Sequence, residues 1–574
     1  MSRHLSEAAK HAHHAVTSNV IHVPSIRYLG ILPVIVMLGG AVVLLGMSSL
    51  VKRPLRLRVA TATTLIISLT AFGLAWWQWA DVQSRGPYTT IDHAVVVDGL
   101  AVLITVLVTA AMALSALVAE GYLAREGIDG AELHVLAMVS AAGAILMAEA
   151  NDLVIVFLGL EILSIALYVL TAFNHKRTES GEAALKYFVL GGFSSAVFVY
   201  GIALTYGATG TTNLTQIASF LSHNVLVHDG VLLAGMSLLL VGFAFKIAAV
   251  PFHMWTPDVY QGAPTPVTAF MAAGTKVAAF GGLLRVFVSS FGVLASDWRP
   301  IIYALAIVTL VVGAGLAVVQ RDIKRMLAYS SINHAGFVLL GLQAATARGV
   351  SSALYYLFAY MFMVIGSFAV VTVMGRMGDA DHDISSYRGL AKRQPLLALA
   401  FAVLLLAQAG VPFTTGFLTK FQVVIASVDG HSVPLAVVAM VSAAVAAFFY
   451  LRVTVLMYAT SDEPSDGVPD AAPTVTPALV GAAGGGRTMW SGTDAAGETR
   501  TRLNAALLME DDASAEPASD EVETTTETEE VTRIPVPVGA AVAIGICVAV
   551  TVVFGIIPAP LVDFAHRATL LFLP

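Results

Sequence analysis

Four ionisable side chains lie inside long apolar stretches of this sequence, and they are its first candidates for chemistry. Glu161 occurs in "FLGLEILSIALYVL", Lys246 in "VGFAFKIAAVP", Lys276 in "TKVAAFGGLL" and Lys420 in "TGFLTKFQVV". In a membrane helix such a residue costs about 2.5 to 3.5 kcal/mol to insert, so its presence points to a function. We therefore interpret these four residues as a chain of proton-binding sites.

Reversible protonation is the chemistry that suits a buried lysine near a glutamate. Burial disfavours a charged ammonium group, whereas a nearby carboxylate favours it. If the distance or hydration of a pair between Glu161 and Lys246 changes, the lysine can gain or lose its proton near neutral pH. An arginine, which keeps its charge, could not do this. The residue types therefore predict a relay rather than fixed charges.

Helix-breaking residues accompany two of the lysines. Pro251 follows Lys246, whereas Pro412 and Gly416 precede Lys420. Proline removes a backbone hydrogen bond and breaks a helix, which frees carbonyl groups that protein or water must satisfy at membrane depth. We therefore expect a hydrated cavity at the first break. The reversed order of lysine and break is typical of inverted repeats, whose equivalent helices run in opposite directions.

Two histidines are further candidate relay points. His253 follows the first break in "PFHMW", and His334 lies in "LAYSSINHAGF" beside Ser330 and Ser331. A neutral imidazole can both accept and donate a proton near pH 7. A structural role is the alternative interpretation for both His253 and His334.

The composition requires a membrane setting for these residues. The chain of 574 residues is 57% hydrophobic and 12% charged, and its mean hydropathy is +0.80. These values are typical of a polytopic membrane protein and argue against a nucleic-acid partner. Its single cysteine, Cys547, lies in an apolar run, so the sequence predicts no thiolate metal site and no iron–sulfur ligands in this chain.

Fourteen apolar runs are long enough, at about 20 residues each, to cross a bilayer. They start near Tyr28, Val59, Val95, Leu133, Leu153, Ala183, Val231, Val267, Ile301, Met326, Ala353, Leu396, Pro434 and Pro535. The sequence thus predicts an all-α polytopic membrane protein of about 14 transmembrane helices. Its helices 7 and 12 should be broken, and helices 4–8 and 9–13 should form two inverted five-helix repeats.

Lysine and arginine concentrate in alternate short loops, which predicts the orientation. One set of loops includes the basic clusters at 52–58, 321–325 and 388–393, whereas the other contains few basic residues. Because loops rich in lysine and arginine face the cytoplasm, we expect both termini to lie on the outer side of the cytoplasmic (inner) membrane. An even number of spans agrees with this.

The sequence divides into six regions. They are a polar N-terminal tail (1–27), helices 1–3 (28–130), the first repeat (131–295), the second repeat (296–460), an acidic cytoplasmic insertion (461–533) and the last helix with a C-terminal tail (534–574). The insertion is rich in Asp, Glu, Thr, Gly and Pro, so its composition favours a flexible segment.

Two segments resemble a known family. "HMWTPDVYQGAPTPVTAFMAAGTKVAAF" and "RDIKRMLAYSSINHAGF" are similar to the antiporter-like subunits of bacterial respiratory complex I, the proton-pumping NADH:quinone oxidoreductases. The resemblance covers about residues 95–458. "TPDVYQGAPTP" and the lysine in the twelfth helix are most similar to the N subunits. The insertion and the polar tail depart from the family pattern.

The resemblance implies a function and a role for each site residue. Glu161 would pair with Lys246, Lys276 would connect two half-channels, and Lys420 would lie on the exit side, with His334 on a hydrated axis. Redox chemistry with NADH, FMN, iron–sulfur clusters and quinone would belong to partner subunits. A neighbouring antiporter-like subunit M and the small membrane subunits J and K would be among the partners. The alternative is a subunit of a multisubunit Mrp-type cation/proton antiporter, against which the "VYQGAP" segment argues.

Overall fold

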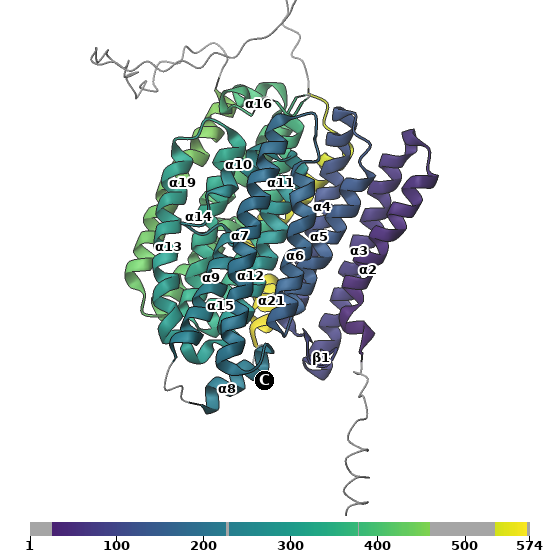
Figure 1. Ribbon diagram of the computed structural model, residues 1–574. Coiled ribbons are helices and arrows are strands. Elements are labelled where there is room, and N and C mark those ends of the chain that lie inside the picture. Colours follow the sequence, from purple (N-terminus) through teal and green to yellow (C-terminus); the bar gives the residue numbers. More distant parts are fainter. Residues whose placement is uncertain (1–25, 225–228, 377, 381, 460–533, 571–574) are drawn as a thin grey trace, which may run out of the picture. The chain divides into compact units, whose positions relative to one another are not determined.

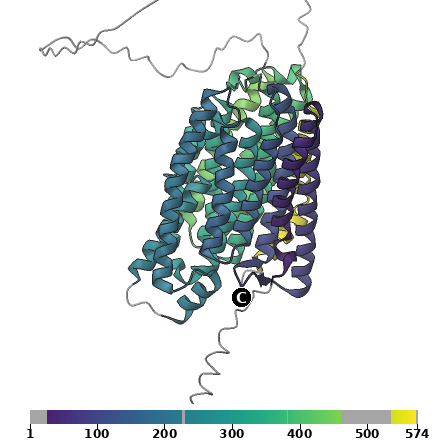
Figure 2. The ribbon, with the colours of Figure 1, turned by 45° about the vertical axis from the view of Figure 1, so that its right-hand side comes forward.

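The computed structural model describes residues 26–224, 229–376, 378–380, 382–459 and 534–570. Most of the predicted N-terminal tail and all of the predicted acidic insertion lie outside the described residues. The described part is a bundle of helices that run side by side (Figures 1 and 2). The all-helical membrane fold predicted from the sequence is confirmed.

The bundle is built from long helices joined by short elements. In chain order the elements are α2 (Tyr28–Leu50), α3 (Arg53–Arg85), β1 (Tyr88–Thr90), β2 (Val95–Val97), α4 (Gly99–Glu126), α5 (Ala131–Glu149), α6 (Leu153–Thr171), α7 (Thr178–Thr209), α8 (Leu214–His223), α9 (Gly230–Ile247), α10 (Trp255–Gly262), α11 (Thr265–Phe270), η1 (Met271–Thr275), α12 (Lys276–Leu284), η2 (Arg285–Ser290), η3 (Gly292–Leu294), α13 (Ala295–Val318), α14 (Ile323–Ala344), α15 (Ala347–Met374), η4 (Ile384–Tyr387), α16 (Leu390–Arg393), α17 (Pro395–Ala409), α18 (Thr415–Asp429), α19 (Val433–Tyr458), α20 (Val538–Ile556) and α21 (Ala559–Leu570).

Twelve helices among the described residues are long and apolar enough to cross a membrane. The two other predicted spans differ from these for physical reasons. The tenth is α14, whose side chains are almost all buried and include many polar groups. The twelfth is divided into α17 and α18, of 15 residues each. The count of fourteen spans therefore stays a prediction.

Several elements were not predicted from the sequence. A short hairpin pairs β1 with β2, so Val95 begins a strand, and the helix begins at Gly99 after Asp98 caps it. In Figure 1 this hairpin and α8 lie at one end of the bundle, whereas α10 and α16 lie at the other. The predicted C-terminal tail contains the short helix α21.

A buried ion pair ties α4 to the long interrupted helix that begins at α11. The guanidinium of Arg285 donates two hydrogen bonds to the carboxylate of Asp98, at 2.9 and 2.7 Å, and a third to the carbonyl oxygen of Ala148. Both side chains are 4% exposed. The bidentate geometry compensates both charges and fixes the helix that carries Lys276 against α4 and α5.

Helices α5 and α6 approach each other closely through two glycines. A Cβ added at Gly159 would lie 2.6 Å from the backbone nitrogen of Met147, and one added at Gly143 would lie 2.5 Å from that of Leu163. Any side chain at either position would push the helices apart. Because Glu161 is two residues from Gly159, this contact sets the position of the carboxylate.

We predict that Gly159→Ala destabilises the packing of α5 against α6 by about 1–3 kcal/mol, the usual cost of overpacking. The expected result is less assembled protein in the membrane and a lower melting temperature of the purified assembly. Gly46→Ala is the matched control, because a Cβ there meets no atom within 4 Å. Equal stability of the two variants would contradict the close approach.

Candidate functional site

Lys246 lies in the last turn of α9, where the first break begins. The helix ends at Ile247, and the turn that contains Pro251 separates it from α10. The ammonium of Lys246 is buried and donates to the hydroxyl of Ser164 at 2.8 Å and to that of Tyr187 at 3.1 Å. The break therefore places an ammonium group against two hydroxyls from neighbouring helices.

Near the first break, a side chain of the protein provides a hydrogen bond to a backbone carbonyl group. The indole nitrogen of Trp255 donates to the carbonyl oxygen of Phe245 at 3.0 Å, and the ring of Trp255 stacks on that of Tyr187 with centroids 4.6 Å apart. At this carbonyl group a side chain of the protein supplies the hydrogen bond that water was expected to supply.

Glu161 lies on α6 and is partly exposed at the side of the bundle. Its carboxylate accepts a hydrogen bond from the hydroxyl of Ser195 on α7. Within the described residues no hydrogen bond or ion pair joins Glu161 to Lys246. Ser164, which Lys246 contacts, is one turn from Glu161 on the same helix. The two charged groups are near each other without direct contact.

Lys276 is the first residue of α12, directly after the π-helical turn η1. A π-helical turn often marks a functional site, because it shifts the register of the side chains that follow. The buried ammonium of Lys276 donates to the carbonyl oxygen of Ser331 at 2.9 Å and also bonds the hydroxyl of Ser331. That hydroxyl lies 2.7 Å from the hydroxyl of Tyr360.

His334 is at the centre of a buried hydroxyl network one turn further along α14. Its two ring nitrogens lie 2.6 Å from the hydroxyl of Tyr356 and 3.1 Å from that of Tyr450. The Tyr450 hydroxyl also bonds Ser330 and donates to the side-chain oxygen of Gln408 at 3.5 Å. Ser330 is adjacent in sequence to Ser331, the partner of Lys276.

Lys420 closes the second break. Its buried ammonium donates to the carbonyl oxygens of Gln408 at 2.8 Å and Ala409 at 2.9 Å, the last two residues of α17. A cation at a helix C-terminus interacts favourably with the helix dipole. Gly416 is required here, because an added Cβ would lie 1.8 Å from the carbonyl oxygen of Ala407.

The structure thus joins some predicted residues and leaves others apart. Lys276 bonds Ser331, whose hydroxyl contacts Tyr360. His334 belongs to a second network, with Tyr356, Tyr450, Ser330 and the side chain of Gln408, and Lys420 bonds the main-chain carbonyl of Gln408. Among the described residues no hydrogen bond joins the Lys276 group to the His334 network. Lys246 begins a separate group with Ser164 and Tyr187. His253 is half-buried in the turn after α9, and one of its ring nitrogens is buried without a hydrogen-bond partner among the described residues.

Most of the hydroxyls around the lysines, Glu161 and His334 were not predicted from the sequence. They come from tyrosines and serines in apolar helices: Ser164, Tyr187, Ser195, Tyr356, Tyr360 and Tyr450. The side chain of Gln408 could have been noticed, since it interrupts "LLLAQAG" just before a break. Across the described residues, no group of three or more His, Cys, Asp or Glu is arranged to hold a metal ion.

Comparisons with known proteins agree on the family. The family model described as "NADH:quinone oxidoreductase/Mrp antiporter, TM" matches residues 150–446. NADH-quinone oxidoreductase subunit N of Trichlorobacter lovleyi is 43% identical over 418 residues, which are 72% of this chain and 86% of that protein. The subunit N of Rhodococcus opacus is 50% identical over 364 residues, 62% of this chain and 67% of that one.

Solved structures give the same fold. A chain of respiratory complex I from Thermus thermophilus is similar with a TM-score of 0.69 and 27% identity, over 92% of this chain and 98% of that chain. A chain of the Mrp complex from Dietzia sp. has a TM-score of 0.71 at 20% identity, over 94% and 97%, and at that identity it shows the fold alone. This chain therefore belongs to the NADH-quinone oxidoreductase subunit N family, within the NADH:quinone oxidoreductase/Mrp antiporter membrane proteins.

Proposed function

We propose that this chain is the proton-translocating N subunit of a bacterial NADH:quinone oxidoreductase and acts as part of a translocase. The observation that carries the proposal is the row of three buried lysines, two of which, Lys246 and Lys276, bond hydroxyl groups that can pass on a proton. Ser330, which is adjacent in sequence to the Lys276 partner Ser331, bonds the hydroxyl of Tyr450. That hydroxyl donates to the side chain of Gln408, and Lys420 bonds the main-chain carbonyl of the same residue. Family membership supplies the reaction to which this path is coupled.

In this proposal redox energy from other subunits changes the interaction between Glu161 and Lys246. The partly exposed carboxylate can respond to a neighbouring subunit, and Ser164, one turn away on the same helix, bonds the ammonium of Lys246. A proton released by Lys246 would pass to Lys276 and then to Lys420, across steps that no hydrogen bond among the described residues bridges. Moving one charge across 100 mV costs about 2.3 kcal/mol, so each step must be driven. His334 and His253 are auxiliary relay points.

The cellular setting follows from the same proposal. The partners would include the neighbouring antiporter-like subunit M and the small membrane subunits J and K. NADH, FMN, iron–sulfur clusters and quinone would be bound by other subunits. We place the chain in the cytoplasmic membrane with both termini outside, with 131–295 and 296–460 as its inverted repeats. The breaks at α9/α10 and α17/α18, each with a buried lysine, support that repeat.

A subunit of an Mrp-type cation/proton antiporter is the alternative function. The likeness to the Dietzia sp. chain supports a shared fold and does not favour that activity. The relatives of highest identity given above are N subunits of NADH-quinone oxidoreductases. The two functions differ in whether proton movement requires NADH oxidation or a sodium or potassium gradient.

We predict that Lys246→Ala abolishes proton pumping while the complex still assembles, because alanine removes the group that exchanges the proton near Glu161. The measurement is NADH-driven acidification of inverted membrane vesicles, together with NADH:quinone turnover. The control is Lys392→Ala, an exposed lysine at the end of the bundle. Normal pumping and turnover in Lys246→Ala would make this lysine a structural charge and favour the antiporter alternative.

We also predict that Tyr450→Phe slows pumping by about tenfold or more, within the range that a positioned proton donor contributes. The ring and its packing remain, whereas the hydroxyl that joins Ser330, His334 and Gln408 is lost. Tyr355→Phe is the matched control, since that hydroxyl is buried without a hydrogen-bond partner among the described residues. Equal pumping rates in both variants would argue against transfer through Tyr450.

A further inference from the structure

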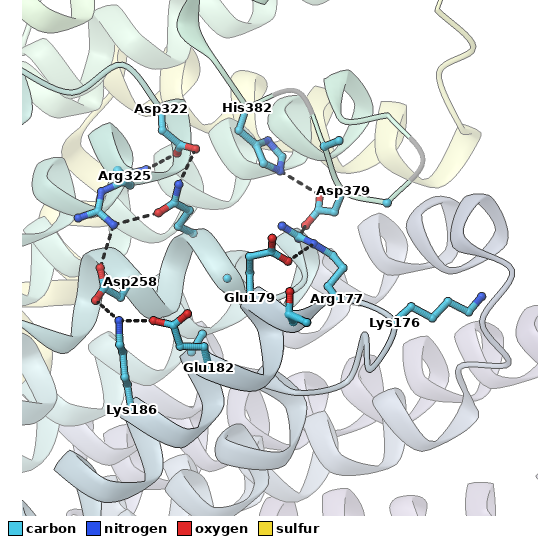
Figure 3. A pocket seen from close by; sticks show the side chains of 16 residues that line it. Lys176, Arg177, Glu179, Glu182, Lys186, Asp258, Asp322, Arg325, Asp379 and His382 are labelled. Carbon is cyan, nitrogen blue, oxygen red and sulfur yellow. Dashed lines mark hydrogen bonds and ion pairs between the residues drawn. The ribbon is translucent and has the colours of Figure 1, made fainter. Parts of the chain in front are cut away.

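A charged cavity of about 670 Å³ lies beside α10 and is not used by the relay described above. Figure 3 shows its wall, on which oppositely charged side chains alternate. The carboxylate of Asp258 accepts from Lys186 at 2.9 Å and from Arg325 at 2.8 Å. Burial raises the pKa of Asp258, but these two cations outweigh it and hold the pKa below its ordinary value. The wall around Asp258 is therefore a set of fixed, paired charges.

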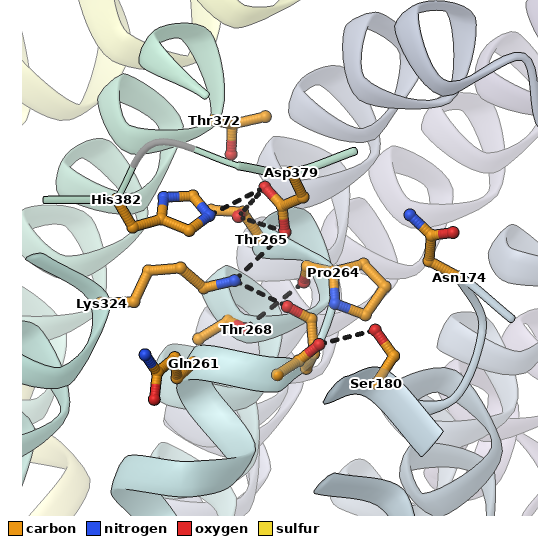
Figure 4. Close-up of polar contacts among 12 residues, drawn as sticks. Asn174, Ser180, Gln261, Pro264, Thr265, Thr268, Lys324, Thr372, Asp379 and His382 are labelled. Carbon is orange, nitrogen blue, oxygen red and sulfur yellow. Dashed lines mark hydrogen bonds and ion pairs between the residues drawn. The ribbon is translucent and has the colours of Figure 1, made fainter. Parts of the chain in front are cut away.

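Asp379 forms the innermost part of this cavity, and it is fully buried. Its carboxylate contacts Lys324 at 3.2 Å and His382 at 3.3 Å, and accepts from the hydroxyl of Thr265 at 2.8 Å (Figure 4). It also pairs with Arg177 at 3.1 Å (Figure 3). Burial raises the pKa of the Asp379 carboxyl, but the cations around it more than offset this and hold the pKa well below its usual range. Asp379 is thus a fixed anion rather than a proton carrier.

Lys324 connects this anion to an interruption of the main chain. Helix α10 ends at Gly262 and α11 begins at Thr265, so the carbonyl groups at the end of α10 lack the partners that a continuous helix would give them. The ammonium of Lys324 donates to the carbonyl oxygen of Ala263 at 2.8 Å, and the hydroxyl of Ser180 donates to that of Gly262 at 2.7 Å. The ion pair therefore holds the main chain at the point where it changes direction.

The segment held in this way carries two residues next to the relay. Tyr260, on α10, is buried, contacts the ring of Trp255 and lies beside Ser331. Lys276 follows on the same chain after α11 and η1, and it bonds the same Ser331. A shift of the main chain at Ala263 would move Tyr260 and Lys276 relative to α14.

We propose that the ion pair between Asp379 and Lys324 is a positioning element of the proton relay. By fixing the carbonyl of Ala263, it sets the placement of Tyr260 and Lys276 against Ser331. This inference rests on the proposed function. A buried ion pair is weak evidence for stability, because desolvation of the two charges offsets their attraction. The informative feature is that the pair is directed at the main chain where the helix is interrupted.

The test uses the complete complex with three variants: Asp379→Asn, Lys324→Met and the two together. Each single variant leaves a buried charge without its main partner and should lower the amount of assembled complex. The double variant removes both charges, while Arg177 keeps Glu179 at 3.8 Å. Assembly should return in the double variant to within about twofold of wild type, since paired replacements are often neutral. The control is Glu179→Gln, which removes a negative charge from the same cavity without touching Ala263.

The readouts are complex abundance, NADH:quinone turnover and protons moved per NADH. If the pair positions the relay, the double variant assembles but pumps roughly tenfold or more slowly, as expected when reacting groups are misplaced. If the double variant assembles and pumps like wild type, the pair is structural and the proposal is overturned. Should it not assemble, Thr265→Val decides: reduced pumping with normal assembly supports the proposal, and normal pumping overturns it.

Lys246→Ala separates this inference from the proposed function. If pumping continues in Lys246→Ala, the proposed proton relay itself is contradicted. Pumping that is lost in Lys246→Ala but normal in the Asp379/Lys324 double variant would overturn the positioning proposal alone.

Discussion

A lysine ammonium group taken out of water must find oxygen atoms to replace its hydration shell, and this need organises the interior of the protein. Lys246 has two side-chain hydroxyls, Lys276 a hydroxyl and a carbonyl, and Lys420 two carbonyls. For Lys246 and Lys276 these oxygens come from other helices. Each of these lysines therefore has two roles. Its side chain is a proton-binding group, and its hydrogen bonds link neighbouring helices, since an unsatisfied buried charge would be costly.

The broken helices follow from the same requirement. A continuous membrane helix uses nearly all its carbonyl groups internally, so it has few to offer to a cation. At the end of α17 the interruption releases the carbonyls of Gln408 and Ala409, and Lys420 binds both. At the end of α10 the carbonyl of Ala263 is free, and Lys324 binds it. The breaks are thus the places where backbone dipoles can stabilise buried positive charge.

Much of this could be predicted from the sequence, because the strongest signals are local. A charged residue within an apolar run and a proline near it are both visible without a structure. These signals identified Lys246 and Lys420 as candidates and predicted both helix breaks. The long apolar runs predicted the class of fold. They did not predict the β1–β2 hairpin or α8, whose sequences lack such a run. The exact count of fourteen spans stays a prediction, because α14 and the divided α17 and α18 are not among the twelve described helices that are long and apolar enough to cross a membrane.

The connecting groups could not be predicted, for a physical reason. Tyr450 and Ser330 are far apart in sequence, and a hydroxyl in an apolar helix costs too little to stand out. Lys324 lies among basic residues at a helix start, where charge is expected to face the cytoplasm. Its burial against Asp379 depends on the loop that follows the next helix, α15. Tertiary packing decides which of these polar groups meet, and periodicity carries no record of it.

Lys276→Arg in the assembled complex tests most directly whether the buried lysines carry protons. Arginine keeps the positive charge and its hydrogen bonds to protein oxygens, but it does not release its proton. The account predicts that this variant assembles and loses NADH-driven proton pumping. Pumping at the wild-type ratio of protons to NADH would contradict it, because a fixed charge at this position would then be sufficient.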